Sequence, residues 1–120
     1  MIGGVGASAV WPLAMALIIE QADNAGLLHA GVNTQHLSNI CNCCPCCCAS
    51  LKGITLKGMD SHGFLNALFL APIDEGSCTG CGRGVERCPV QAISLDDHAA
   101  ADPLKCLGCG LCSTACPVEA

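Results

Sequence analysis

The chain has 120 residues, a formal net charge of −5 and 13 cysteines. Its five lysines and arginines are dispersed, which argues against nucleic-acid binding, because phosphate backbones are bound by concentrated basic surfaces. Aromatic side chains are nearly absent, so we expect metal or covalent links to stabilise a fold whose hydrophobic core is thin.

The first segment, residues 1–19, carries no charge but is interrupted by glycines and Pro12, with no basic residue beside it. We therefore expect neither a membrane span nor a secretory signal. A buried helix from Pro12 to Asn24 is predicted instead, because proline suits a first helical turn and Gly26 suits a helix end. A loop or a second helical turn should follow over residues 26–40.

Residues 41–48, CNCCPCCC, contain six cysteines: Cys41, Cys43, Cys44, Cys46, Cys47 and Cys48. An odd total with adjacent cysteines is a poor disulfide framework, so we expect reduced, cytoplasmic, metal-binding thiols. Soft sulfur ligands suit a further iron–sulfur site, zinc or copper(I); packing and redox sensing are the other interpretations. His29 or His36 could complete a mixed site, although a lone histidine is more often a hydrogen-bonded structural residue.

Residues 49–72 are punctuated by glycines, and HGFLNALFLAP at 62–72 suits either a short helix or a buried strand. Pro72 marks the expected boundary between a helical, cysteine-rich region (residues 1–72) and a second domain (residues 73–120). Both ends of the chain are abrupt, which indicates a piece of a larger protein.

The second domain contains a repeated motif. CTGCGRGVERCP at 78–89 returns as CLGCGLCSTACP at 106–117, but Gly84 stands where the second copy has Cys112. The glycines shared by the two copies permit unusual dihedral angles and let amide N–H groups approach the sulfur atoms. CPVQAISL predicts a turn of helix from Pro89 and then a strand through Ile93 to Leu95.

The complete pattern, C-x2-C-x2-C-x3-C-P at residues 106–117, is the bacterial ferredoxin signature. Residues 73–120 thus resemble a two-cluster bacterial-type ferredoxin domain. Together with Gly26–His29 and the CNCC-x-CCC run, the whole chain resembles the C-terminal part of anaerobe-type 4Fe–4S dicluster-binding proteins. The resemblance implies an α+β fold in which short strands and helical turns surround iron–sulfur clusters.

In that family the fourth cysteine of each motif serves the other cluster. The resemblance therefore implies one complete 4Fe–4S site, formed by Cys88, Cys106, Cys109 and Cys112. It implies a second site with three thiolates, formed by Cys78, Cys81 and Cys116. At that second site Gly84 leaves several interpretations open: a 3Fe–4S cluster, a labile 4Fe–4S cluster, a ligand supplied from residues 41–48, or a degenerate site.

The function implied is one-electron transfer to a redox partner protein in anaerobic metabolism, as a carrier or as the ferredoxin module of a larger oxidoreductase. An enzyme or a redox or metal sensor is the alternative, with the open iron or the thiols of residues 41–48 binding a ligand or a soft metal. Zinc or copper storage would suit residues 41–48 but not the repeat.

Overall fold

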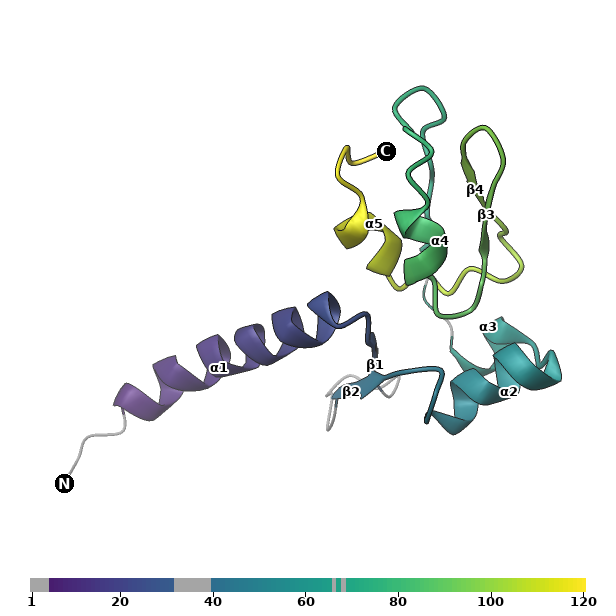
Figure 1. Ribbon diagram of the computed structural model, residues 1–120. Helices are drawn as coiled ribbons and strands as arrows, with labels where there is room; N and C mark the ends of the chain where they lie inside the picture. Colours follow the sequence, from purple (N-terminus) through teal and green to yellow (C-terminus); the bar gives the residue numbers. More distant parts are fainter. Residues whose placement is uncertain (1–4, 32–39, 66, 68) are drawn as a thin grey trace.

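The computed structural model describes residues 5–31, 40–65, 67 and 69–120, which form an α+β fold (Figure 1). The elements in chain order are α1 (Val5–Asn24), β1 (Leu28–Gly31), β2 (Ile40–Cys43), α2 (Ala49–Lys57), α3 (Ser61–Phe64), α4 (Arg83–Arg87), β3 (Ile93–Leu95), β4 (Ala99–Ala101) and α5 (Leu111–Ala115). Within the described residues, no helix has the length and apolar character needed to cross a membrane.

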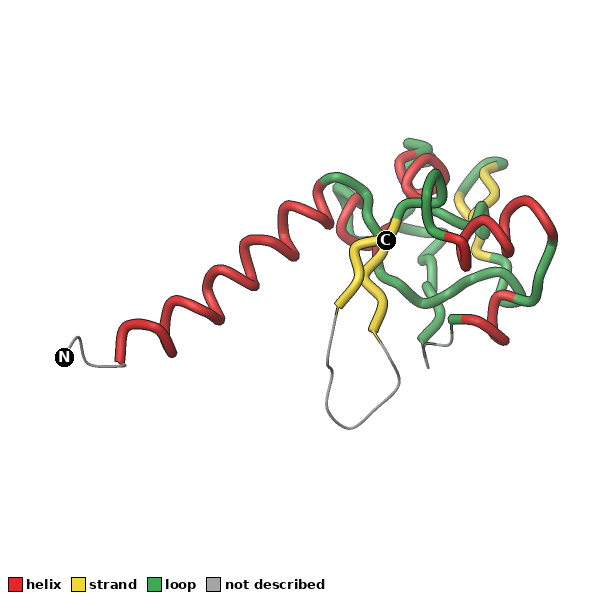
Figure 2. Tube along the Cα trace, turned by 90° about the horizontal axis from the view of Figure 1, so that it is seen from below, coloured by secondary structure: helices red, strands yellow, loops and turns green. Residues whose placement is uncertain are grey.

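Helix α1 ends where the sequence predicted, at Asn24, but it begins at Val5 and contains Pro12 in its interior. The end is set by Gly26, whose positive φ of 76° lets its N–H donate to the Asp23 carbonyl oxygen at 2.8 Å. The prediction of a buried helix was wrong, because α1 leaves the body of the molecule as an arm (Figures 1 and 2). Leu13 and Leu17 are 67% and 58% exposed.

The segment after α1 forms a β-hairpin instead of the predicted loop or helical turn. Strands β1 and β2 pair antiparallel, with Leu28 opposite Cys43 and Gly31 opposite Ile40. Leu28 is buried, and this burial fixes the register because a shift by one residue would turn its side chain outward. His36 lies outside the described residues.

Residues 49–65 contain two short helices, α2 and α3. Helix α2 ends at Lys57 and is capped by Gly58, a left-handed residue with φ of 63°. Asp60 caps α3 by accepting a hydrogen bond from the His62 N–H at 3.2 Å. Of the two interpretations of HGFLNALFLAP, a short helix is correct for its first residues.

The repeat region has the predicted strand at Ile93–Leu95, which pairs antiparallel with β4. The predicted helical turn from Pro89 is wrong: the helix of this unit, α4, ends at Arg87, ahead of the proline. Cys88 is extended, with φ −73° and ψ 112°, because proline disfavours helical geometry in the residue before it.

The two copies of the motif share one backbone conformation. The φ values are 66° at both Gly80 and Gly108, 77° and 81° at Gly82 and Gly110, and 53° at both Gln91 and Glu119. Helices α4 and α5 occupy equivalent positions after these glycines and pack against each other. The sequence repeat is therefore also a structural repeat.

One hydrophobic core joins the N-terminal region to the repeat. Leu28, Leu51 and Ile54 from the first part are buried with Val90, Leu107 and Leu111 from the second. Partly buried cysteines from both parts pack against this core, namely Cys43, Cys48, Cys88 and Cys109. The thiols of residues 41–48 consequently lie beside the repeat.

Candidate metal centre

Each cysteine loop begins with the same turn, organised by an aspartate four residues before the first cysteine. The Cys78 N–H donates to the Asp74 carbonyl oxygen at 3.0 Å, and the Cys106 N–H donates to that of Asp102 at 2.9 Å. The Asp74 carboxylate accepts from the Ser77 hydroxyl and the Gly76 N–H, which lower its pKa. An aspartate four residues before the first cysteine of both motifs is the sequence signal for this shared turn.

The structure brings together the four cysteines expected at the complete site. Cys106 is buried, and Cys88, Cys109 and Cys112 are half-buried. Burial raises the pKa of the Cys109 thiol, and negative charge on Cys88, Cys112 and Cys106 raises it further. Burial also raises the pKa of Cys112, which is within electrostatic range of Cys88 and Cys106. Four thiolates within electrostatic range of one another, one buried and three half-buried, would repel one another, so they suit a site where bound cations compensate their charge.

The spacing of these sulfur atoms argues for a group larger than one ion. In a tetrahedral zinc site with bonds of about 2.3 Å, the sulfur atoms are separated by roughly 3.8 Å. Across the described residues, no three of the repeat cysteines have all their sulfur atoms within 4.8 Å of one another. The donor set therefore fits an iron–sulfur cluster better than a zinc ion.

The cysteines of the second expected site line one cavity of about 240 Å³. Cys78, Cys81 and Cys116 are in its wall, together with Gly84. At about 30 Å³ per water molecule, this space corresponds to roughly eight waters. Cys112 lines the same cavity, so it stands between the two sites. None of the thiols described at residues 41–48 lines this cavity, which argues against a ligand from that segment at the Gly84 position.

Backbone N–H groups point at the sulfur atoms. The Ala92 N–H donates to Cys88 Sγ at 3.2 Å, and the Ala120 N–H donates to Cys116 Sγ at 3.3 Å. These two bonds are equivalent in the repeat. The Ala120 N–H, with those of Val118 and Glu119, lowers the pKa of the Cys116 thiol. Such bonds favour thiolates and tune the potential of iron–sulfur sites.

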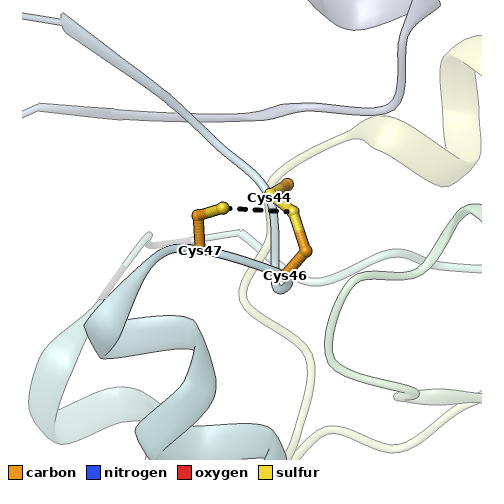
Figure 3. Close-up of side chains that lie close together, drawn as sticks. All are labelled: Cys44, Cys46 and Cys47. Carbon is orange, nitrogen blue, oxygen red and sulfur yellow. Dashed lines mark hydrogen bonds between the residues drawn. A yellow bond between two sulfur atoms is a disulfide. The ribbon is translucent and has the colours of Figure 1, made fainter.

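The cysteines of residues 41–48 are not all reduced, contrary to the expectation from sequence. Cys44 and Cys46 are joined by a disulfide. The turn over Pro45 places their Cα atoms 5.2 Å apart, within the range of ordinary disulfides. The Cys47 sulfur lies 3.7 Å from that of Cys46, and because Cys46 is oxidised the Cys47 S–H is the donor of this contact (Figure 3).

The six thiols of this segment divide into two groups, so they do not form one site. Cys44, Cys46 and Cys47 have sulfur atoms within 4.8 Å of one another, a spacing that suits a single ion, but two of them are bonded together. Cys43 interacts instead with Cys48 and Cys41: burial, then these neighbours, raises its pKa to about 11. Amide groups at the start of α2, first that of Leu51, lower the pKa of Cys48.

The histidine expected near these thiols has a structural role. His29 Nδ1 lies 2.8 Å from the Asn42 side-chain oxygen, across the β1–β2 pair. Its Nε2 is 4.0 Å from an Asp23 carboxylate oxygen and has no hydrogen-bond partner among the described residues. No group with metal-ligand spacing in the described part of the chain includes His29.

In a comparison with protein families, residues 71–120 match the model of a 4Fe-4S dicluster domain. No curated protein and no solved structure matches the chain significantly. Residues 71–120 therefore form a 4Fe–4S ferredoxin-type domain, which supports a role in iron–sulfur electron transfer.

Proposed function

We propose that the chain is a one-electron carrier, or the ferredoxin module of a larger oxidoreductase. A 4Fe–4S cluster at Cys88, Cys106, Cys109 and Cys112 would supply the redox chemistry. The observation that carries this proposal is the convergence of these four cysteines at a spacing too wide for one ion. The chain's own contribution is to hold the thiolates in an apolar wall and to donate N–H groups to their sulfur atoms.

We further propose that Cys78, Cys81 and Cys116 hold a second cluster, either 3Fe–4S or labile 4Fe–4S. The cavity of about 240 Å³ that these residues line supports it. Gly84 offers no ligand there, so one corner of a cubane would lack a protein thiolate. Cys112, which lines this cavity and neighbours Cys88, would be the shortest protein connection between the two sites.

The proposed partner is a redox protein with a basic docking surface, in keeping with the net charge of −5. The β3–β4 turn carries the exposed residues Asp96 and Asp97, and the Ala99 N–H that follows donates to Cys78 Sγ at 3.4 Å. An acidic surface beside the second site would bring such a partner close to the iron. A cytoplasmic location suits a site that needs reduced thiolates.

Anaerobic reconstitution followed by iron and sulfide analysis tests this proposal. We expect more than one cluster's iron per chain, with equivalent acid-labile sulfide and an absorption band that bleaches on reduction. The variant Cys109→Ser should lose the stable cluster, whereas Cys47→Ser should keep it. A chain without labile sulfide, or with equal sulfide in both variants, would refute the ligand assignment.

A further inference from the structure

The Cys44–Cys46 disulfide lies where a reactive pair would be expected, at a turn on the protein surface (Figure 3). Cys46 and Cys47 are exposed, whereas Cys44 is half-buried. An external disulfide could therefore reach Cys46, while Cys44 remains close behind it. A pair with one accessible and one sheltered sulfur is the arrangement that thiol–disulfide exchange needs.

One sulfur-bearing residue of the disulfide, Cys46, shares a cavity with Cys88, a ligand of the proposed complete site. Cys46 and Cys88 line one cavity of about 400 Å³, together with Pro45, Pro89 and Arg87. Cys43 and Cys48, which flank the disulfide in sequence, pack against the same core as Cys88 and Cys109. Only the tertiary structure creates this proximity, because Cys46 and Cys88 are far apart in the chain.

Arg87 brings a cationic side chain to the lining of this cavity. The Arg87 guanidinium donates to the carbonyl oxygens of Asp23 at 2.6 Å and Asn24 at 3.0 Å, at the end of α1. Its Nε is buried without a hydrogen-bond partner among the described residues. A positive charge in the wall of this cavity would favour a thiolate at Cys46 once the disulfide is reduced.

We propose that Cys44 and Cys46 are a redox-active pair that receives electrons through the Cys88 site and delivers them to an external disulfide. This inference rests on the proposed electron-transfer function and adds its substrate class. Disulfides in the cytoplasm are usually transient and catalytic or redox-sensing, which agrees with such a role.

The reaction balances with two electrons. A low-potential one-electron donor protein supplies them singly, and with two protons they break the Cys44–Cys46 bond and leave two thiols. The Cys46 thiolate then attacks the external disulfide, forming a mixed disulfide and releasing one substrate thiol. Cys44 attacks Cys46, which restores the internal disulfide and releases the second substrate thiol.

An anaerobic reductive titration of the cluster-loaded full chain tests this inference, with photoreduced deazaflavin as the one-electron donor. Wild type and Cys47→Ser, which both keep the disulfide, should accept about two electrons per chain more than Cys46→Ser. Cys46→Ser should nevertheless bind as much iron, because Cys46 is not a proposed cluster ligand. Electron paramagnetic resonance of the same samples reports reduction of the iron sites independently.

Trapping of thiols with N-ethylmaleimide and peptide mass spectrometry gives a second readout. Labelling of Cys44 and Cys46 should rise at least about tenfold on titration, which requires the iron site to lie about 30 mV below this two-electron couple. The metal-free chain should show no such rise in labelling. If this chain unfolds, the disulfide becomes more exposed, so a lack of labelling could not be caused by hidden cysteines. After reduction, the loaded wild type should release coloured thiol from dithiobis(nitrobenzoic acid) in excess of Cys46→Ser.

Equal electron uptake by wild type and Cys46→Ser, with normal iron signals, would overturn this inference and leave the proposed carrier function intact. If N-ethylmaleimide labels Cys44 and Cys46 before the titration, and Zn²⁺ alone blocks this labelling, the two residues form a soft-metal site and the inference is overturned. Absence of any reducible iron signal would instead overturn the proposed function itself, and this inference with it.

Discussion

Replacement of Gly84 by cysteine should complete the second iron–sulfur site. A Cβ atom at this position would meet Ile93 Cδ1 at 3.6 Å and Cys112 Cβ at 3.8 Å, both ordinary van der Waals contacts. Gly84 lies inside α4 and lines the cavity of Cys78, Cys81 and Cys116. The backbone therefore accepts a side chain here, and glycine-to-cysteine replacement within a helix should change stability by only a few tenths of a kcal/mol.

The effect on the cluster should be much larger than the effect on the fold. If the wild-type site holds three irons, iron content should rise from about seven to about eight atoms per chain in Gly84→Cys. The electron paramagnetic resonance signal of the oxidised 3Fe form should disappear at the same time. If the wild-type site holds a labile 4Fe form, iron content should instead become resistant to dilution and mild chelation.

The matched controls are Gly84→Ala and Gly84→Ser, which add nearly the same bulk without a thiol. Both should keep the wild-type iron content and spectrum. Unchanged iron content, chelation resistance and spectrum in Gly84→Cys would refute the assignment of position 84 as the missing ligand. If Gly84→Ala gained iron or chelation resistance to the same extent as Gly84→Cys, packing at this position, and not a missing thiolate, would limit the site.

Three further predictions follow from the backbone, the thiol pairs and the contacts of α1. Gly108→Ala should destabilise the loaded protein more than Gly110→Ala in chemical denaturation. Both residues have positive φ, which costs alanine about 1 kcal/mol. A Cβ atom at Gly108 would also overlap the Phe69 carbonyl oxygen, whereas a Cβ atom at Gly110 would meet no atom within 4 Å. Equal losses would contradict the placement of Phe69. Alkylation of Cys48 at pH 8 should be much faster than alkylation of Cys43, because a pKa of about 11 leaves Cys43 with about one thiolate per thousand molecules. The rate of Cys43 alkylation should then rise with pH up to about 11. Similar rates for the two cysteines at pH 8 would contradict the interaction between Cys43 and Cys48. Arg87→Met should free the end of α1, because it removes two hydrogen bonds to the Asp23 and Asn24 carbonyl oxygens, each worth about 1.5–3 kcal/mol. Limited proteolysis should therefore cut α1 faster in Arg87→Met than in the control Lys52→Met, which removes an exposed cation from α2.

The sequence by itself determined the features that depend on neighbours along the chain. The spacing of Cys106, Cys109 and Cys112 predicted convergent thiols because a short gap with glycines bends the backbone around one point. Gly26 identified the end of α1, and the segment CPVQAISL after the first motif identified β3. The grouping of Cys88 with the cysteines of the second motif was predicted from the family resemblance, because no property of residue 88 alone indicates it.

Only the tertiary structure decided which distant segments meet. The pairing of β1 with β2 overrode a loop-like sequence, because burial of Leu28 against Leu51 and Leu111 lies beyond any local pattern. The Cys44–Cys46 disulfide was not expected, since adjacent thiols can pair in many ways and the turn geometry selects one. Cys46 and Cys88 line one cavity because both parts of the chain build the core together. Spacing along the chain predicted which cysteines belong to one motif, whereas packing between distant segments decided which cysteines of different motifs share a core or a cavity.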